Sequence, residues 1–122
     1  MKNVLLVEDS SATRSMIRAT LEEIEGLSFE EASTGFEALK ALPTQSFDLI
    51  ITDINMPDIN GLELINFIKN HPSYRNIPFL IVSTEGSEED KKRGIELGAS
   101  DYITKPFNPE NLRKIVKKTL GL

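Results

Sequence analysis

Val4-Leu5-Leu6-Val7-Glu8-Asp9 and Leu49-Ile50-Ile51-Thr52-Asp53 are two short apolar runs that each end in acidic residues. Continuous apolar runs of this length, rich in Val and Ile, are typical of strands that are buried on both faces of a parallel sheet. A buried carboxylate without a partner is costly, so an acid at a strand end must face a solvated crevice or bind a cation. In open α/β sheets that crevice lies beyond the carboxyl ends of the strands. Carboxylates gathered there favour a hard, oxygen-preferring cation such as Mg²⁺.

The rest of the chain alternates between strand-like and helix-like segments. Strands are predicted at residues 2–7, 27–32, 48–53, 79–82 and 101–104, and helices at 11–25, 35–42, 62–70, 87–97 and 109–120. In the first helix, Ile17, Leu21 and Ile24 fall on one face, and Gly26 supplies the stop. Five β/α units in this order predict one α/β domain over residues 1–122, a doubly wound parallel sheet with helices on both faces.

The composition excludes several classes of function. The chain has no cysteine, so disulfides, thiolate metal sites and cysteine nucleophiles are ruled out. Its apolar runs are far shorter than the ~20 residues of a membrane helix. Residues 1–7 lack the layout of a signal peptide, and we therefore expect a cytoplasmic protein with no membrane contact. A net charge of −5 argues against nucleic acid as a direct partner.

The predicted strand ends present groups of complementary charge. These groups are Glu8-Asp9, Asp53, the hydroxyls of Ser83-Thr84, and Lys105. Three carboxylates, one Mg²⁺ and one lysine sum to zero charge, so such a site can accept the anionic oxygens of a phosphoryl group. Asp53 can then act as the nucleophile and form an aspartyl phosphate.

The chain resembles a response-regulator receiver domain from Val4 to about Leu120, and within that family it is most similar to the stand-alone chemotaxis regulators of the CheY type. The resemblance implies five helices around a five-stranded sheet of order 2-1-3-4-5, the order known for CheY and flavodoxin. It rests on five motifs in order: Leu6-Val7-Glu8-Asp9-Ser10; Thr52-Asp53-Ile54-Asn55-Met56-Pro57 followed by Asn60-Gly61-Leu62; Val82-Ser83-Thr84-Glu85; Gly98-Ala99 with Asp101-Tyr102; and Lys105-Pro106-Phe107.

The resemblance implies a Mg²⁺-dependent phosphoacceptor site. Asp53 corresponds to the residue that is phosphorylated. Asp9 and Asp53 correspond to direct Mg²⁺ ligands, and Asn55 to the residue that offers its backbone carbonyl. Glu8 corresponds to an outer acid that reaches the metal through water.

The resemblance also implies a switch. Ser83 corresponds to the hydroxyl that moves to the phosphoryl oxygen on activation, and Tyr102 to an aromatic switch on the output face. Lys105 corresponds to the lysine that pairs first with the carboxylate and then with the phosphoryl group. A cis Lys105–Pro106 bond is expected to aim that lysine inward.

Two positions are expected to tune dephosphorylation, and two others depart from the usual family residue. Asn55 and Glu85 correspond to the variable positions two residues past the nucleophile and the hydroxyl. Glu8 stands where Asp is commoner, and Ser83 stands where Thr is commoner, but neither change removes a functional group. Thr84 has two open interpretations, a helix-entry residue or a residue that gates access to the site.

Simpler interpretations remain for several residues. Glu8-Asp9 or Ser10 can cap the first helix, which is compatible with metal binding. Tyr102 can be ordinary half-buried packing. His71, the only histidine, is interpreted as a surface cap at a helix end and not as a phosphorylated residue.

The leading hypothesis is a monomeric signalling module that takes a phosphoryl group from a sensor histidine kinase. Beyond its own phosphorylation and slow autodephosphorylation it is not expected to be an enzyme. Phosphorylation is expected to change a surface that binds a downstream target protein, formed by residues 87–97, 101–104 and 109–120.

Three alternatives compete with this hypothesis. The chain can be a receiver excised from a multidomain regulator or hybrid kinase. A small aspartate-nucleophile phosphatase would place a second acid two residues after the nucleophile, where this chain has Asn55. A flavodoxin-like FMN carrier would need a Ser/Thr/Gly-rich loop after the first strand, where this chain has acids.

Overall fold

Five β-strands and five α-helices alternate in a computed structural model that describes residues 1–56 and 58–122. In chain order they are β1 (Lys2–Val7), α1 (Ser11–Leu21), β2 (Leu27–Ala32), α2 (Gly35–Ala41), β3 (Leu49–Thr52), α3 (Gly61–Lys69), β4 (Phe79–Ser83), α4 (Glu88–Glu96), β5 (Asp101–Thr104) and α5 (Pro109–Leu120), with a 3₁₀ turn at Leu42–Thr44. The longest of these helices, α5, has 12 residues. No helix in the described part of the chain combines the length and the apolar character needed to cross a membrane.

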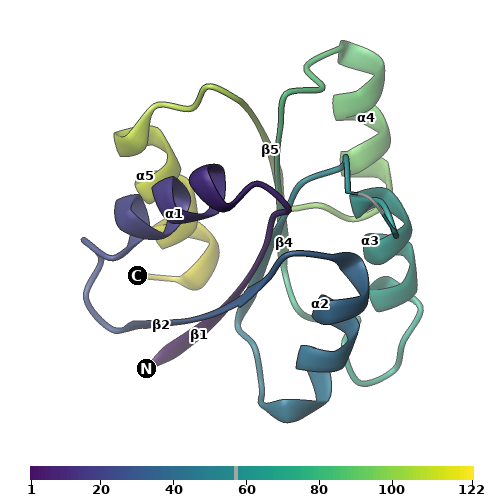
Figure 1. Ribbon diagram of the computed structural model, residues 1–122, viewed down its shortest axis with the longest axis horizontal. Helices are drawn as coiled ribbons and strands as arrows, with labels where there is room; N and C mark the ends of the chain where they lie inside the picture. The colour runs from purple at the N-terminus through teal and green to yellow at the C-terminus, as the bar shows by residue number, and fades with distance from the viewer. Residues whose placement is uncertain (57) are drawn as a thin grey trace.

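The strands form one parallel sheet in the order β2-β1-β3-β4-β5 (Figure 1). This confirms the α/β fold and the 2-1-3-4-5 order implied by the resemblance. Because β1 and β3 are neighbours with Val7 opposite Thr52, the residues that follow these two strands emerge side by side. β4 pairs with β5 in the same way, with Ser83 opposite Thr104.

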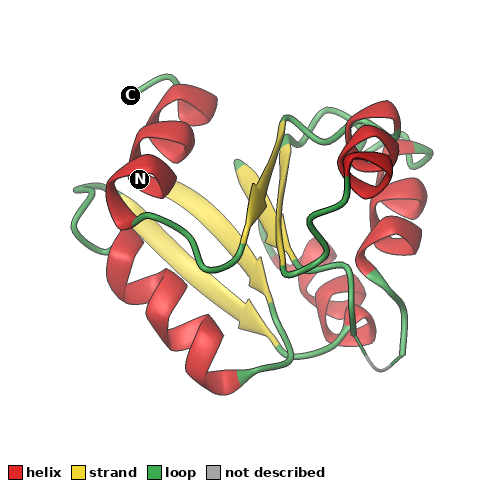
Figure 2. Ribbon diagram, turned by 90° about the horizontal axis from the view of Figure 1, so that it is seen from above, coloured by secondary structure: helices red, strands yellow, loops and turns green. Residues whose placement is uncertain are grey.

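Helices cover both faces of the sheet, with α1 and α5 on one side and α2, α3 and α4 on the other (Figures 1 and 2). Successive residues of β1 alternate between the two cores: Val4 and Leu6 pack towards α1 and α5, and Leu5 and Val7 pack towards α2 and α3. Each buried side chain of this size contributes about 1.5–3 kcal/mol relative to an exposed one. The uninterrupted apolar runs are therefore explained by burial on both faces.

The first helix is shorter than predicted. The periodicity favoured residues 11–25, but α1 ends at Leu21. Beyond that point the Ile24 N–H donates to the Leu21 carbonyl at 3.0 Å, three residues back, which tightens the last turn and ends the α-helix. Ile24 is still buried at 6% exposure, as its place in the apolar pattern predicts. Gly26 reverses the chain with a φ of 85°, a conformation that glycine adopts without strain.

Candidate functional site

Three carboxylates gather at the carboxyl ends of β1 and β3. Glu8 and Asp9 follow β1, and Asp53 follows β3; each offers an oxygen within 4.8 Å of the others. Glu8 is 2% exposed and Asp53 is 7% exposed, whereas Asp9 faces solvent. The pairing of Val7 with Thr52 brings these acids together. The cluster predicted from the strand ends is therefore present.

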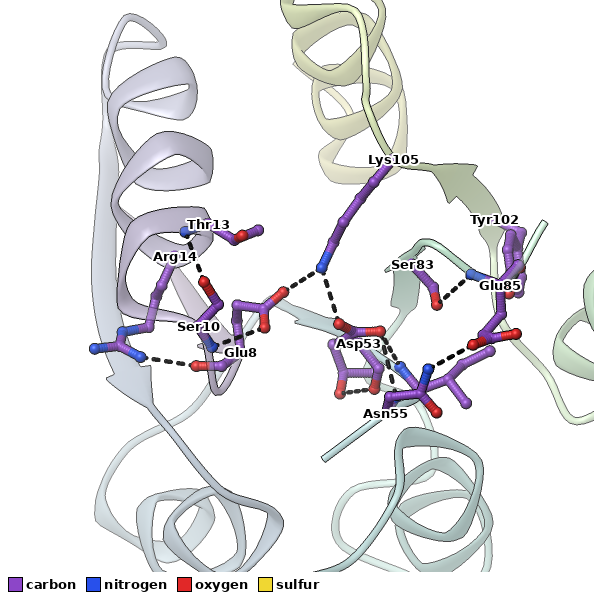
Figure 3. Close-up of polar contacts among 12 residues, drawn as sticks. Glu8, Ser10, Thr13, Arg14, Asp53, Asn55, Ser83, Glu85, Tyr102 and Lys105 are labelled. Carbon is purple, nitrogen blue, oxygen red and sulfur yellow. Dashed lines mark hydrogen bonds and ion pairs between the residues drawn. The ribbon is translucent and has the colours of Figure 1, made fainter. Parts of the chain in front are cut away.

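Lys105 joins the two buried acids of this cluster. Its Nζ lies 2.5 Å from Glu8 Oε1 and 2.8 Å from Asp53 Oδ2 (Figure 3). It follows β5, and its bond to Pro106 is cis, as expected. The Lys105 N–H donates to the Ser83 carbonyl at 2.8 Å, which fixes the backbone from which the side chain reaches inward. Two buried carboxylates without this cation would be strongly unfavourable.

Burial and ion pairing shift two pKa values at this site. Burial raises the pKa of Glu8, and the bonds from Lys105 and from the Ser10 N–H only partly oppose that effect. Burial alone would lower the pKa of Lys105, but its bonds to Asp53 and Glu8 outweigh burial and raise that pKa overall. Lys105 is therefore a permanent cation at neutral pH, while an ionised Glu8 is held at an energetic cost.

Glu8→Gln should stabilise the protein at neutral pH when no divalent ion is present. A raised pKa means that folded Glu8 binds its proton more tightly than the unfolded chain does, so stability falls as pH rises through the Glu8 pKa. Glutamine removes the charge and keeps the shape and one acceptor oxygen, which can take the bond from Lys105 or the bond from the Ser10 N–H. We expect a melting temperature above that of the wild type at pH 7. The gain should disappear below the ordinary carboxyl pKa of 4.5.

Thermal unfolding in EDTA, followed by circular dichroism at several pH values, measures this difference. Glu89→Gln is the matched control because Glu89 is an exposed acid on α4. A Glu8→Gln protein that is less stable than the wild type at pH 7 would show that the ion pair with Lys105 outweighs the cost of burial.

The backbone after β3 fixes the orientation of Asp53. Its Oδ1 accepts the N–H groups of Ile54 at 2.6 Å and Asn55 at 3.3 Å. The loop then returns to the strand, where the Gly61 N–H donates to the Ile54 carbonyl at 2.8 Å. A Cβ at Gly61 would lie 2.0 Å from the Asp53 backbone oxygen, so only glycine permits this close approach. The motif residue Pro57 lies outside the described residues.

A chain of hydrogen bonds extends from the site towards β5. Ser83 is fully buried, and its Oγ accepts the Glu85 N–H at 3.1 Å. The Asn55 side-chain amide donates to Glu85 Oε1 at 2.7 Å, and the Tyr102 hydroxyl donates to the Glu85 backbone oxygen (Figure 3). Thr84 is exposed. Glu85 therefore connects the loop after β3, the end of β4 and the aromatic ring on β5.

The β1–α1 turn contains one contact that sequence reasoning missed. Ser10 was expected as a cap, and its Oγ does accept the Thr13 N–H at 3.3 Å, while its own N–H donates to Glu8 Oε2 at 3.0 Å. The missed residue is Arg14, whose Nη1 donates to the Glu8 backbone oxygen at 2.7 Å. An arginine one helical turn after an acid pair is the only signal that the sequence offers for this contact.

The carboxylate ligands of this cluster fit Mg²⁺. The three carboxylates exceed the single ammonium of Lys105 by two charges, which a divalent cation balances. Among the described residues, the side-chain atoms of the cluster that could bind a metal are carboxylate oxygens, the ligands that Mg²⁺ prefers. One member, Asp9, faces solvent, so the cation has a path to the cluster and can keep part of its water shell.

Comparisons with known proteins agree with this geometry. A family model described as the response regulator receiver domain matches residues 4–117. The chain is 35% identical over 119 residues to the chemotaxis protein CheY homolog of Campylobacter jejuni, covering 97% of this chain and 92% of that protein. It is 34% identical over 121 residues to the sensor histidine kinase CheAY of Helicobacter pylori, with 98% of this chain but only 15% of that protein covered. The solved structure of the chemotaxis protein CheY4 of Vibrio cholerae matches with a TM-score of 0.89 and 39% identity, covering 98% of this chain and 99% of that one.

Proposed function

The chain belongs to the response-regulator receiver domains, the CheY-like phosphoacceptor modules of two-component signalling, and we propose that Asp53 accepts a phosphoryl group from the phosphohistidine of a sensor kinase. Members of this family are signalling domains and not conventional enzymes. The observation that carries the proposal is the position of Asp53. Its carboxylate lies at the end of β3, between the Lys105 ammonium at 2.8 Å and the acids of β1.

The two carboxylate oxygens of Asp53 have different partners. Oδ1 is held by backbone N–H groups, whereas Oδ2 is held by the flexible side chain of Lys105. Oδ2 is therefore the oxygen that can exchange its partner and attack phosphorus. An electron pair of Oδ2 forms the new P–O bond as the P–N bond of the phosphohistidine breaks. The leaving imidazole nitrogen keeps the bonding pair of the P–N bond and takes up a proton.

Charge compensation decides whether this attack is possible, because a carboxylate and a phosphoryl group repel one another. Lys105 can follow the transferred phosphoryl oxygens, since its Nζ already lies at Asp53 and its side chain is 14% exposed. Asp9, Asp53 and the Asn55 carbonyl would hold Mg²⁺, with Glu8 beside them, and the ion would neutralise the remaining phosphoryl charge. Asn55 and Glu85, which are hydrogen-bonded to each other, are placed to tune the later loss of the phosphoryl group.

Mass spectrometry after treatment with acetyl phosphate and Mg²⁺ tests the proposed function directly. The wild-type protein should gain one phosphoryl mass. Loss of that mass in alkali and on treatment with hydroxylamine should identify it as an acyl phosphate. No added mass under conditions that label a known receiver domain would refute the proposal.

Output is proposed to follow from the bonds around Glu85. The Ser83 hydroxyl can donate to a phosphoryl oxygen on Asp53, and a hydrogen bond to a charged group is stronger than a neutral one. If Ser83 moves, the Glu85 N–H that it accepts moves with it, and the bond from the Tyr102 hydroxyl to the Glu85 carbonyl is disturbed. The phosphoryl group can thus bias the surface of α4, β5 and α5 only through its different contacts in the two states.

The helix α4 suits a surface that changes. Every residue of α4 is described, and only Gly94 is buried. A Cβ at Gly94 would lie 2.7 Å from Ile81 Cδ1 and 3.1 Å from Tyr102 Cδ2, so the helix is seated on these two side chains. Ile95 is 47% exposed on the same helix. A movement of Tyr102 therefore reaches α4 directly, and few other buried contacts resist it.

Ser83→Ala and Tyr102→Phe should separate phosphorylation from output. Each variant removes one hydroxyl of the chain that runs through Glu85 and leaves Asp53, Lys105 and the acids in place. Labelling of Asp53 should stay close to the wild-type level. Amide shifts on phosphorylation, measured by NMR, should extend to residues 84–97 and Tyr102 in the wild type and should shrink in both variants.

Tyr74→Phe is the matched control, because Tyr74 lies beyond α3 and stacks on His71 at 4.3 Å. Phosphorylation shifts confined to residues that touch Asp53 in the wild type would remove the support for this switch. For a downstream partner, an allosteric coupling of roughly 5- to 150-fold in affinity is the usual range, and the two variants should lose most of it.

We propose a cytoplasmic, monomeric, single-domain regulator like the CheY homologs that the chain matches over almost their whole length. Its proposed partners are a sensor histidine kinase and a target protein at the α4-β5-α5 surface. The match to 15% of CheAY makes a receiver within a larger kinase the alternative. The rate of phosphotransfer from a phosphorylated sensor kinase can be compared with the rate of transfer from acetyl phosphate. A much faster transfer from one kinase would identify that kinase as the partner.

A further inference from the structure

The β1–α1 turn, residues 8–10, carries two of the three clustered carboxylates, and an arginine holds its backbone. Arg14 lies near the start of α1, and its Nη1 donates to the Glu8 backbone oxygen at 2.7 Å (Figure 3). Its Nε donates to Glu31 Oε1 at 2.8 Å. The Arg14 side chain is 19% exposed. Arg14 therefore bridges the turn that carries the acids to β2, at the edge of the sheet.

The end of the parallel ladder explains why an arginine is needed at this point. The Glu8 N–H donates to the carbonyl of Ala32, the last residue of β2, at 3.0 Å. If the parallel ladder continued, the Glu8 carbonyl would accept a hydrogen bond from the backbone N–H two residues after Ala32. The strand has ended there, and the Arg14 guanidinium supplies the donor instead.

We propose that Arg14 is a positioning residue for the cation site, and that Glu31 holds it in place. Fixing the Glu8 carbonyl fixes the peptide plane between Glu8 and Asp9, and so sets the direction from which the Asp9 carboxylate approaches Asp53. The rigid planar guanidinium can make both contacts at once, whereas an ammonium on a flexible stem cannot hold both directions. This inference rests on the proposed Mg²⁺-dependent function and assigns it a residue outside the acidic cluster.

Arg18 provides a matched control on the same helix. It lies one turn further along α1 and contacts the other oxygen of Glu31, with Nη1 at 2.5 Å from Oε2. Among the described residues its ion pairs are with Glu31 and Glu22, and its guanidinium lies over the Phe29 ring. A change at Arg18 therefore removes the same charge and perturbs the same carboxylate without touching the Glu8 carbonyl.

The test compares Arg14→Gln, Arg14→Lys, Glu31→Gln and Arg18→Gln with the wild type. The first readout is the Mg²⁺ dissociation constant from an NMR titration with Mg²⁺ alone. The second, in EDTA, is the carbonyl carbon shift of Glu8 and the amide nitrogen shift of Asp9, which report the hydrogen bond at that carbonyl.

We expect Arg14→Gln to weaken Mg²⁺ binding by about tenfold, the lower end of the effect of losing a residue that orients a metal ligand. The Glu8 and Asp9 shifts should move in the same variant. Arg14→Lys should recover part of both effects, because it can keep one bond. Glu31→Gln should weaken binding less than Arg14→Gln does, and Arg18→Gln should match the wild type in both readouts.

Two results would overturn the assignment. One is wild-type Mg²⁺ affinity and unchanged Glu8 and Asp9 shifts in Arg14→Gln. The other is an equal loss of affinity in Arg18→Gln, which would show that the arginines only stabilise α1. If Arg14→Gln fails to fold, the comparison of Arg14→Lys with Arg18→Gln carries the test. A wild-type protein that binds Mg²⁺ but is not labelled by acetyl phosphate would overturn the proposed function alone, because neither readout depends on phosphorylation.

Discussion

Asp53→Asn should abolish labelling by acetyl phosphate completely. Asparagine keeps the oxygen that accepts the Ile54 N–H but replaces the carboxylate nucleophile with a neutral amide, which does not attack phosphorus. Asp53 is buried at 7% exposure and asparagine has nearly the same shape, so the change should preserve the fold. Intact-mass spectrometry should show the full phosphoryl mass on the wild type and none on the variant.

Asp48→Asn is the control for this experiment. Asp48 lies directly before β3, at the opposite end of the strand, where its Oδ2 accepts the Asn3 N–H at 2.8 Å. Asparagine can accept the same bond, and this variant should be labelled as the wild type is. Undiminished labelling of Asp53→Asn would instead assign the phosphoryl group to another residue, which peptide mapping would then identify.

Removal of the cation should have an effect of nearly the same size. The two charges by which the carboxylates exceed Lys105 would repel an incoming phosphoryl group, so EDTA should stop labelling. Asp9→Ala should mimic EDTA, because it deletes the exposed carboxylate of the cluster. We expect its Mg²⁺ affinity to fall by at least about 100-fold, the upper end of the effect of losing a residue that only orients a ligand.

Labelling rates measured across a range of Mg²⁺ concentrations test this expectation. Asp9→Ala should need far more Mg²⁺ than the wild type, or fail to label at any concentration. Glu89→Ala, which removes an exposed acid from α4, should leave the Mg²⁺ dependence unchanged. Full labelling in EDTA would contradict a metal-dependent mechanism for this chain.

The fold could be predicted where burial imposes a pattern on the sequence. Runs such as Val4–Val7 and Leu49–Thr52 must be apolar on both faces, and the structure has strands at both. The hydrophobic pattern of the sequence does not predict the order of the strands in the sheet, and that prediction came from the family resemblance. The end of α1 was also hidden, because Ile24 is buried whether the helix continues or turns.

The site was predictable to the extent that its chemistry lies in side chains at strand ends. Glu8, Asp9, Asp53 and Lys105 meet as expected, because the ends of neighbouring parallel strands meet at one edge of the sheet. Arg14 was missed because it binds a backbone carbonyl, and every residue has one. The hydrogen bond between the side chains of Asn55 and Glu85 depends on the conformations of two loops. No periodic pattern in the sequence predicts those conformations.

The ion pair between Lys105 and Glu8 joins residues 97 positions apart, and this separation has a consequence for the newly made protein. Glu8, Asp9 and Asp53 are synthesised early, but the lysine that compensates their charge leaves the ribosome only after most of the chain has been made. Until β5 has paired with β4, the acids lack the Lys105 ammonium, which compensates part of their charge. A ribosome-bound or truncated chain that stops before Lys105 should therefore be unable to accept a phosphoryl group. A kinase should then transfer phosphoryl groups only to chains that have finished folding.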